Sequence, residues 1–361
     1  MTKSFPLVSV VMPVYNAQAY LVDAVASIIE QTLADWELVC VDDGSTDATP
    51  EILRWMAQRD ARIRVVRQEN AGIVEALNRG CTLARGPLIA RMDADDIALP
   101  ARLERQVEWF RRYPKCVAAG TGILEIDADG DPLRVTYPPM AEDQIQRSLL
   151  SRQTGLYHPT VMMRTEAWRA VGGYRRQYQW VEDHDLWLRM AQRGPLMNLP
   201  SVLLAYRQHA SSVCWRRAEQ QRELMDQLLR EAYQARGLAF TGQAVSHRPA
   251  GRSAAGPGKW ARAAARGGFP GTACKHLYRL LCSDADPAYR IRMTAETLLR
   301  MAAGVANPRI WLRRPPRIPA FEQWHRQWND HDRAGEGRGG ESHRAAARSM
   351  DGGIDGGSRA A

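Results

Sequence analysis

Residues 87–96, with the sequence Pro-Leu-Ile-Ala-Arg-Met-Asp-Ala-Asp-Asp, join an apolar run to a cluster of three carboxylates. The apolar part, residues 87–90, predicts a short buried strand. Side chains alternate between the two faces of a strand, so Asp93 and Asp95 project to the same side if the strand continues. Two carboxylates this close are unfavourable unless hydrogen bonds or a cation compensate them, and a hard divalent ion with oxygen ligands is the natural partner. The alternative is a polar loop that caps a helix starting near Pro100.

The N-terminal part of the chain alternates between buried-strand patterns and helical periodicity. We expect strands at residues 7–12, 36–41, 63–66 and 88–92, and helices at residues 20–33, 47–59, 70–84 and 100–112. This alternation predicts a parallel sheet with right-handed crossovers, in which ligands bind at the carboxyl ends of the strands. Polar clusters at residues 13–16, 42–47 and 93–96 each follow a strand end. They should therefore converge on one crevice.

The rest of the sequence predicts further strands and helices of the same domain, followed by segments of different amino-acid composition. Expected elements are strands at residues 117–124, 161–164 and 202–206, a turn and an acidic-basic helix within 125–150, and a helix at 181–192. Gly120-Thr121-Gly122 lacks the third glycine and the following helix of a dinucleotide-binding motif. We assign residues 1–240 to one α/β domain, 241–258 to a linker, 259–330 to a small helical C-terminal extension with helices at 274–281 and 289–301, and 331–361 to a disordered tail.

The amino-acid composition indicates the cellular compartment of the protein. The chain has 361 residues and six cysteines without a CxxC pair, a usage typical of reduced thiols in a cytosolic protein. We find no signal peptide pattern and no apolar run approaching 18 residues, so the expected location is cytoplasmic.

The formal net charge of +9 is unevenly placed. Residues 241–361 carry 20 Lys and Arg against 10 Asp and Glu, whereas residues 1–240 carry 29 against 30. A basic segment with tryptophans at positions 260, 311, 324 and 328 suits an anionic bilayer surface, and hence a peripheral membrane contact. The alternative is a small helical subdomain that packs on the rest of the chain. Nucleic acid is not an expected partner, because no recognised fold or repeated stacking motif accompanies the charge.

Seven motifs together resemble the bacterial family 2 glycosyltransferases, which are inverting enzymes with the GT-A fold. Each is weak alone, but they occur in the family's order and usual separations over about residues 6–215. The motifs are VVMPVYN at 10–16, VDDGSTD at 41–47, NAG at 70–72 with ALNRG at 76–80, DADD at 93–96, HP at 158–159, EDHDLW at 182–187 and YRQH at 206–209. The resemblance implies an α/β fold with a mixed, Rossmann-like sheet flanked by helices.

The resemblance also implies roles on the donor side. Asp95 would hold Mn²⁺ or Mg²⁺, which bridges the phosphates of a nucleotide-sugar, and Asp93 would contact its ribose or sugar. For Asp96 we favour a structural role as the cap of the helix near Pro100. His209 resembles a histidine that completes the metal site in part of the family, although a lone histidine is often a plain surface or core residue.

The nucleobase pocket is implied by the first two motifs. Asp43, with Asp42 as the fallback, resembles the carboxylate that accepts the imide N–H of the base. A turn carboxylate that binds backbone amides is the alternative, more credible for Asp47 than for Asp43. Pro13 and Tyr15 resemble residues that line this pocket, where Tyr15 would stack on the ring, although a turn proline and a half-buried tyrosine would look the same.

The acceptor side rests on the EDHD motif. Asp183 resembles the family's general base, which takes the proton of the attacking hydroxyl. Glu182 and Asp185 would crowd it with like charge and raise its pKa. The alternative is that all three are first-turn acids complementing a helix dipole. His158 would position the acceptor or a loop, or cap the segment before Pro159.

The function implied is transfer of a sugar from a nucleotide-sugar, UDP-linked by our reading, to a hydroxyl of a glycan or lipid-linked acceptor in cell-surface polysaccharide synthesis. A sugar-phosphate nucleotidyltransferase is one alternative, but it needs a glycine- and lysine-rich loop where residues 13–16 have neither. A non-catalytic carbohydrate-binding homologue is another, which the intact acidic motifs oppose. Arg207 would either neutralise the diphosphate or pair with an acid.

Overall fold

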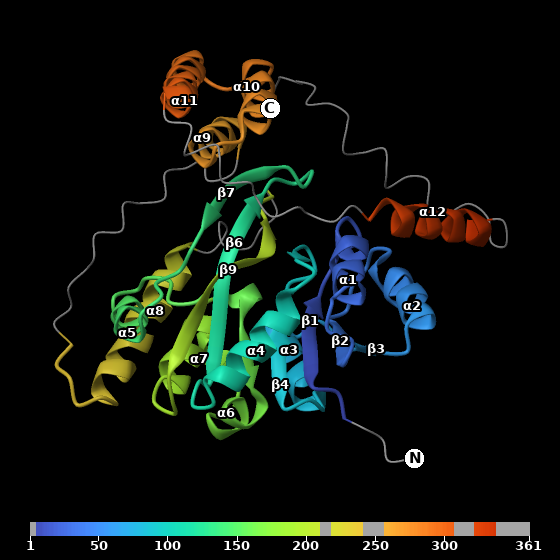
Figure 1. Cartoon of the computed structure of the whole chain (residues 1–361), viewed down its shortest axis with the longest axis vertical. Helices are drawn as coiled ribbons and strands as arrows, with labels where there is room; N and C mark the ends of the chain where they lie inside the picture. Colours follow the sequence, from blue (N-terminus) through green and yellow to red (C-terminus); the bar gives the residue numbers. More distant parts are fainter. Residues whose placement is uncertain (1–4, 210–217, 241–255, 307–320, 337–361) are drawn as a thin grey trace, which may run out of the picture. The chain divides into compact units, whose positions relative to one another are not determined.

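The computed structural model describes residues 5–209, 218–240, 256–306 and 321–336. The chain divides into two compact units, residues 1–320 and 321–361. Helix α12 (Glu322–Glu336) belongs to the second unit, and all other described helices and strands belong to the first (Figure 1).

A parallel half-sheet forms the N-terminal part of the first unit, as predicted. Its strands are β1 (Val8–Val14), β2 (Trp36–Asp42), β3 (Ile63–Arg67) and β4 (Leu88–Arg91), and β1 lies between β2 and β4. The crossover helices are α1 (Leu21–Ile29), α2 (Thr49–Arg59) and α3 (Ile73–Leu83). The strand ends at Val14, Asp42 and Arg91 consequently lie at one edge of the sheet.

The second half of the sheet is mixed. Within the described residues the strand order is β3-β2-β1-β4-β8-β6-β9-β5, with β7 paired to β6. The strands concerned are β5 (Ile97–Ala98), β6 (Ala118–Ile126), β7 (Pro132–Thr136), β8 (Met162–Arg164) and β9 (Leu196–Arg207). The helices around them are α4 (Arg102–Arg112), α5 (Glu142–Leu150), α6 (Thr165–Ala170), α7 (Glu182–Met190) and α8 (Ala218–Gln234). The predicted mixed α/β architecture is confirmed; β5, β7 and α6 were missed.

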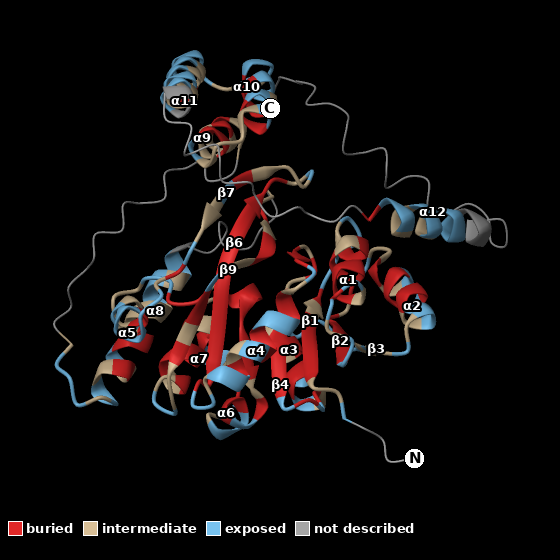
Figure 2. Cartoon of the chain, viewed as in Figure 1, coloured by how far each residue is buried: buried red, intermediate tan, exposed pale blue. Residues whose placement is uncertain are grey.

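The core lies on both faces of the sheet, where helices cover buried strands (Figure 2). Close packing of α3 on the sheet depends on Gly80, because a Cβ atom there would lie 2.5 Å from Cγ1 of Val11. Trp55 of α2 and Trp187 of α7 are among the largest fully buried side chains. This packing holds the helix starts and strand ends that carry the polar motifs in place.

The C-terminal extension consists of α9 (Pro257–Gly267), α10 (Pro270–Leu281) and α11 (Pro287–Ala306). It packs on β7, with alanines of α9 and α10 around the buried Leu133. Lys275 of α10 forms ion pairs with Asp127 at 2.5 Å, with Asp129 at 3.0 Å and with Asp131. This ammonium group neutralises the acidic turn between β6 and β7.

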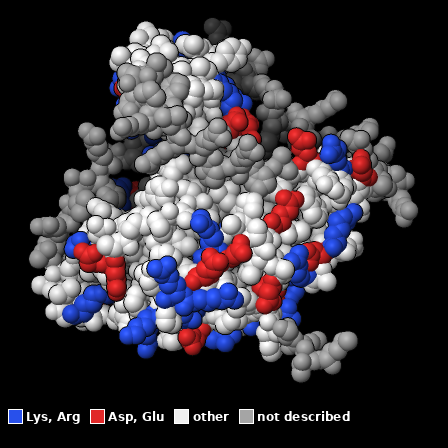
Figure 3. Space-filling model, in the orientation of Figure 1, with Lys and Arg blue, Asp and Glu red and all other residues white. Residues whose placement is uncertain are grey.

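The predicted linker falls largely on residues 241–255, outside the described residues. Of the predicted disordered tail, 331–361, residues 337–361 also lie outside them, but disorder was wrong for residues 331–336, which form the last part of α12. In the ranges that are described, no helix combines the length and apolar character needed to cross a bilayer. On the face drawn in Figure 3, acidic and basic side chains are intermixed rather than gathered into one patch of a single sign. Among the described cysteines, Cys40, Cys81 and Cys116 are buried, Cys274 and Cys282 are exposed, and all are free thiols.

Candidate active site

The loops after β1 and β2 are tied together at the carboxyl edge of the sheet. Asn16, with the left-handed φ of 48°, donates its N–H to the Ser45 hydroxyl at 3.0 Å and accepts the Thr46 N–H at 2.8 Å. These contacts leave Tyr15 52% exposed at the end of β1, next to the half-buried Pro13. The Tyr15 ring is therefore accessible to a planar ligand at this edge.

Asp43 is a turn carboxylate with three hydrogen bonds. It accepts the backbone N–H groups of Ala71 and Gly72, both at 2.9 Å, and the Gln68 amide at 2.8 Å. Asp47 likewise accepts the Thr49 N–H at 3.0 Å. Amide binding, considered more credible for Asp47, is thus present at Asp47 and also at Asp43, which joins the β2 end to the start of α3. A carboxylate has about four lone-pair sites, so its hydrogen bonds leave acceptor capacity.

The carboxylates after β4 form a compact group. Ligand oxygens of Asp93, Asp95 and Asp96 lie within 4.8 Å of one another. The buried Arg91 donates to Asp93 at 2.5 Å. Burial raises the pKa of Asp93, the charges of Asp95 and Asp183 raise it further, and Arg91 opposes both. Asp183 thus acts electrostatically on this group although it lies far along the chain.

Asp96 has a different structural role from the predicted one. It does not cap α4, whose first turn has no side-chain cap. Its Oδ1 accepts the backbone N–H of Arg207 at 2.9 Å, because β5 pairs with β9 and places Ile97 opposite Ala205. Its Oδ2 is buried without a hydrogen-bond partner.

The end of β9 meets the carboxylate group. His209 Nε2 lies 2.8 Å from Oδ2 of Asp95, and its ring centroid is 5.3 Å from that of Tyr20. Arg207 is buried, donates to the Asp95 carbonyl at 2.9 Å and faces Asp23 at 3.4 Å. Pairing with an acid, one of the two roles considered for Arg207, is therefore present, and neutralisation of a diphosphate stays a prediction.

These residues fit a hard divalent ion. Asp95 and His209 offer a carboxylate oxygen and an imidazole nitrogen side by side, and Asp96 Oδ2 is a buried oxygen that lacks a partner. Oxygen ligands with one imidazole suit Mg²⁺ or Mn²⁺.

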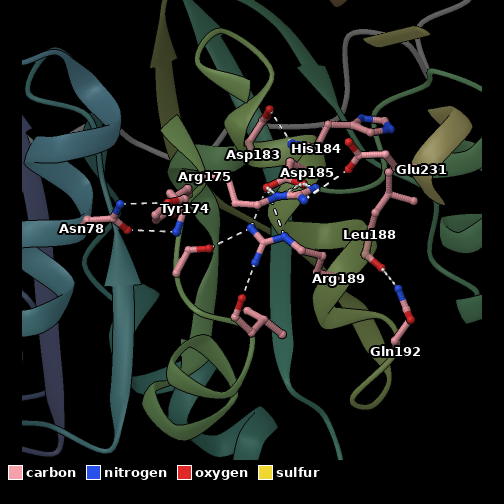
Figure 4. Close-up of polar contacts among 12 residues, drawn as sticks. Asn78, Tyr174, Arg175, Asp183, His184, Asp185, Leu188, Arg189, Gln192 and Glu231 are labelled. Atoms are coloured by element: carbon pink, nitrogen blue, oxygen red, sulfur yellow. Dashed lines mark hydrogen bonds and ion pairs between the residues drawn. The ribbon is translucent and has the colours of Figure 1, made fainter. Parts of the chain in front are cut away.

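The three acids at the start of helix α7 lie in different environments. Asp185 is fully buried and paired with Arg175 and, at 2.6 Å, with Arg189. Figure 4 shows Asp183 pointing away from this ion-paired group, with its carboxylate accepting only the His184 N–H, at 2.7 Å, among the bonds drawn. The expected crowding of Asp183 by Asp185 is therefore wrong, since two guanidinium groups compensate Asp185.

Glu182, the first acid of α7, has a raised pKa. Burial raises the pKa of the Glu182 carboxyl to about 7, and the charge of Asp183 adds to the shift. Its Oε2 accepts the Trp180 N–H at 2.6 Å.

The raised pKa of Glu182 predicts a pH-dependent stability. Between pH 4.5 and about 7 this carboxyl stays protonated in the folded chain but ionises in the unfolded chain, so the free energy of unfolding falls as pH rises through this range. Glu182→Gln should therefore remove a loss of about 3 kcal/mol in unfolding free energy between pH 4.5 and 8. Chemical denaturation at several pH values measures this, with Glu108→Gln on the exposed face of α4 as the control. Equal pH slopes in Glu182→Gln and wild type would contradict it.

Two residues of the quoted motifs, His158 and Asn78, support the site through partners that the sequence did not reveal. His158 is buried, its Nε2 lies 2.9 Å from the Tyr174 hydroxyl, and burial lowers its pKa well below the usual range. Asn78 exchanges two hydrogen bonds of 2.9 Å with the Tyr174 backbone. His158 thus supports the segment before α7 from inside the fold, and Arg91 beside Asp93 was likewise not foreseen.

Comparison with known proteins identifies the family. Residues 9–172 match the model for glycosyl transferase family 2. The putative glycosyltransferase EpsE of Bacillus subtilis (strain 168) is 36% identical over 195 residues, covering 53% of this chain and 69% of EpsE. The amylovoran biosynthesis glycosyltransferase AmsE of Erwinia amylovora is 32% identical over 216 residues, covering 58% of this chain and 79% of AmsE. A crystal structure of S. aureus TarS 1-349 in complex with UDP-GlcNAc matches with a TM-score of 0.48 and 16% identity, covering 82% of this chain and 72% of that one.

The chain belongs to glycosyl transferase family 2. Its mixed sheet flanked by helices is the GT-A architecture implied by the motifs.

Proposed function

We propose that the protein transfers a sugar from a nucleotide-sugar to a hydroxyl group of a glycan or lipid-linked acceptor, with inversion at the anomeric carbon. The observation that carries the proposal is the convergence of two groups at one sheet edge. The Asp95–His209 pair lies at the ends of β4 and β9, and the charge of Asp183 from α7 acts on neighbouring Asp93. A metal-and-phosphate centre next to a carboxylate is what a single displacement on a nucleotide-sugar requires.

The donor would lie along the carboxyl ends of β1, β2 and β4. Asp43 would accept the imide N–H of the base, which favours uracil and hence a UDP-sugar, while Tyr15 stacks on the ring beside Pro13. A depression of about 570 Å³ next to this point is lined by Gly44 and residues 67–70. Asp93 would contact the ribose or the sugar.

Asp95 and His209 would hold Mn²⁺ or Mg²⁺. When bound, the ion supplies Lewis-acid stabilisation of the charge that develops on the diphosphate. The buried Arg91 keeps Asp93 in place beside this pair.

Asp183 would act as the general base. The acceptor oxygen attacks the anomeric carbon, its proton passes to the Asp183 carboxylate, and the bond from that carbon to the diphosphate oxygen breaks. The nucleoside diphosphate leaves with the bonding electron pair. One in-line attack of this kind inverts the anomeric configuration.

A nucleotide-sugar screen tests the proposal. The purified chain is incubated with UDP-, GDP- and TDP-sugars, with Mn²⁺ or with EDTA, and release of the nucleoside diphosphate is measured. We expect metal-dependent release from a UDP-sugar. Release from no nucleotide-sugar, or release undiminished by EDTA, would oppose the proposal.

The biological setting is proposed from the relatives and from the extension. AmsE is named for amylovoran biosynthesis, which favours a role in polysaccharide biosynthesis for this chain as well. We propose residues 1–240 as the catalytic domain, 241–258 as the linker, 259–330 as the helical extension and 331–361 as the tail, in a cytoplasmic protein that contacts the membrane surface.

The extension supports that membrane contact. Exposed apolar side chains lie on α10 and α11, with Tyr278, Ile291 and Leu299 each 71% exposed and Leu281 and Leu298 more than half exposed. Residues 256–306 carry eight Lys and Arg and three Asp and Glu, a net charge of +5. Apolar stripes with a basic surround suit an anionic bilayer.

Flotation with phosphatidylglycerol vesicles measures this contact. The double variant Ile291→Glu/Leu298→Glu should bind the vesicles about tenfold less than wild type, because it removes two exposed apolar side chains that would be buried in the bilayer. Leu238→Glu, at a side chain 50% exposed outside the extension, is the control and should bind normally. Equal binding of the double variant and wild type would contradict the proposed membrane contact.

A further inference from the structure

A polar depression lies beside the N-terminus of α7. It has a volume of about 420 Å³ and is formed by the loop before α7 and by one face of α8. Its lining includes four glutamines, one tryptophan and one carboxylate: Gln177, Gln179, Trp180, Gln220, Glu223 and Gln227. The volume is in the range of small-molecule sites, which is roughly 300–1,000 Å³.

The chemistry of this lining matches a neutral sugar. Each glutamine amide both donates and accepts hydrogen bonds, as sugar hydroxyls do, and the carboxylate accepts further hydroxyl donors. The half-buried Trp180 ring adds an apolar surface of the kind that the C–H face of a pyranose contacts. Among the described residues that line the depression there is no Lys or Arg to pair with a phosphate group, which favours a neutral ligand.

Trp180 is held in an unusual conformation three residues before Asp183. Its φ of 85° is a left-handed value that a bulky residue adopts only under constraint. Its N–H donates to Glu182 at 2.6 Å, and its carbonyl accepts the Gln221 amide of α8 at 3.1 Å. These two bonds fix the backbone of Trp180 between the start of α7 and the face of α8.

The same loop reaches the donor side. A Cβ atom on Gly72 would lie 2.8 Å from Nε2 of Gln179, so the Gln179 side chain packs directly on the Gly72 backbone. The Gly72 N–H is one of the bonds that hold Asp43. Residues 179–183 therefore run from the donor loop, along the depression, to Asp183.

We propose that this depression is an acceptor subsite, which binds a neutral saccharide unit of the acceptor glycan adjoining the unit whose hydroxyl is attacked. The role of the depression in binding an acceptor rests on the proposed function. The class of ligand, a neutral saccharide, rests on the lining residues. Trp180 is the stacking platform, and Gln227 is a hydrogen-bonding residue on the α8 side.

Saturation-transfer NMR tests the subsite directly. The full chain is titrated with cellobiose, lactose, chitobiose and maltose, and the apparent Kd of each is measured. At least one disaccharide should bind the wild type, Trp180→Ala should weaken it about tenfold, and Trp180→Phe should retain binding within about threefold because a ring remains. Gln227→Ala should weaken binding less than Trp180→Ala.

Matched variants separate the subsite from general damage. Trp109→Ala, at a half-buried tryptophan of α4, and Gln58→Ala, at an exposed glutamine of α2, should bind like wild type. No binding of any of the four disaccharides to wild type, or undiminished binding to Trp180→Ala, would overturn the subsite.

Acceptor-independent hydrolysis of the nucleotide-sugar separates this proposal from the proposed function. Trp180→Ala should lower transfer to a saccharide acceptor more than it lowers acceptor-independent hydrolysis of the donor, because Trp180 is assigned to the acceptor and not to the diphosphate. Saccharide binding that depends on Trp180 in a chain without donor hydrolysis would leave the subsite standing and remove the proposed function. Donor hydrolysis without saccharide binding that depends on Trp180 would remove the subsite and leave the proposed function standing.

Discussion

Asp183→Asn is expected to lower the rate of sugar transfer by roughly 10²–10⁴-fold, the usual contribution of a positioned general base. The amide keeps the shape of the side chain and can still accept the His184 N–H at 2.7 Å, but it cannot take a proton from a hydroxyl group. The fold should survive, because Asp183 points away from the Arg175–Asp185–Arg189 group that holds α7.

The competing role of Asp183 as a first-turn acid has its own matched control. Asp143→Asn removes an acid from the first turn of α5, where Asp143 is exposed and paired with Arg147. Both variants lose one favourable helix-dipole interaction, worth about 0.3–1 kcal/mol, so their thermal midpoints should fall by similar small amounts. Only Asp183→Asn should lose transfer. Full transfer activity in Asp183→Asn would remove this residue from the base role.

Glu182 adds a second measurement on the same variant. The charge of Asp183 contributes to the raised pKa of Glu182. Removing that charge should lower the pKa of Glu182 towards its usual range, while burial keeps part of the shift. The pH dependence of stability in Asp183→Asn should therefore be weaker than in wild type, which tests their electrostatic coupling independently of activity.

The parallel half of the sheet was predictable because its strands are buried on both faces. β1 and β2 consist almost wholly of buried residues, so their sequences are predominantly apolar, and the polar Ser9 and Glu37 hydrogen-bond each other at 2.6 Å. The missed elements lack such a signal. β7 begins with a proline and has one fully buried position, and β5 has only two residues.

β9 shows a further limit of local pattern. It extends from Leu196 to Arg207, but only 202–206 was expected as a strand, because Pro200 and polar residues interrupt its first half. The pairing with β6 tolerates them through register shifts near Gly122. Tertiary pairing therefore decides the length of this strand, and tertiary pairing has no local sequence pattern.

The candidate site was likewise predictable only in part. The motifs located the residues, but partners distant in sequence determine what each carboxylate does. Asp96 binds the backbone of Arg207, 111 positions away, and Asp43 binds amides 28 and 29 positions away. Similarly, the compensation of Asp185 depends on Arg175 being folded back onto α7. Sequence spacing cannot supply these contacts, because each depends on how the sheet and helices pack.

Asp95→Asn is expected to weaken Mn²⁺ binding by at least about a hundredfold, since even outer-shell partners of a metal site contribute roughly 10–100-fold. Replacing the carboxylate by an amide removes a charged ligand but leaves the Arg207 bond to the Asp95 carbonyl intact. His209→Ala should weaken binding less, because the charged Asp95 carboxylate remains. Electron paramagnetic resonance titration of Mn²⁺ in the presence of UDP measures both effects without relying on activity.

A second acidic cluster in the same chain provides the control. Oxygens of Asp127, Asp129 and Asp131 lie as close together as those of the first group, within 4.8 Å. Lys275 pairs with all three, however, and Arg279 pairs with Asp129 at 2.9 Å. Asp129→Asn should therefore leave Mn²⁺ binding unchanged, because a built-in ammonium group already compensates that cluster.

The comparison of the two clusters distinguishes a metal site from mere acidity. If any close set of carboxylates bound Mn²⁺, Asp129→Asn and Asp95→Asn would weaken binding alike. Asp127 also meets a histidine, His276, at 2.8 Å, but it is paired with Lys275 as well. If the ion binds where a carboxylate meets a histidine and pairs with no Lys or Arg among the described residues, only Asp95→Asn and His209→Ala will weaken binding. Donor hydrolysis should fall in parallel with Mn²⁺ occupancy in these two variants. Unchanged Mn²⁺ binding in Asp95→Asn would assign the ion, and the phosphates with it, to other residues.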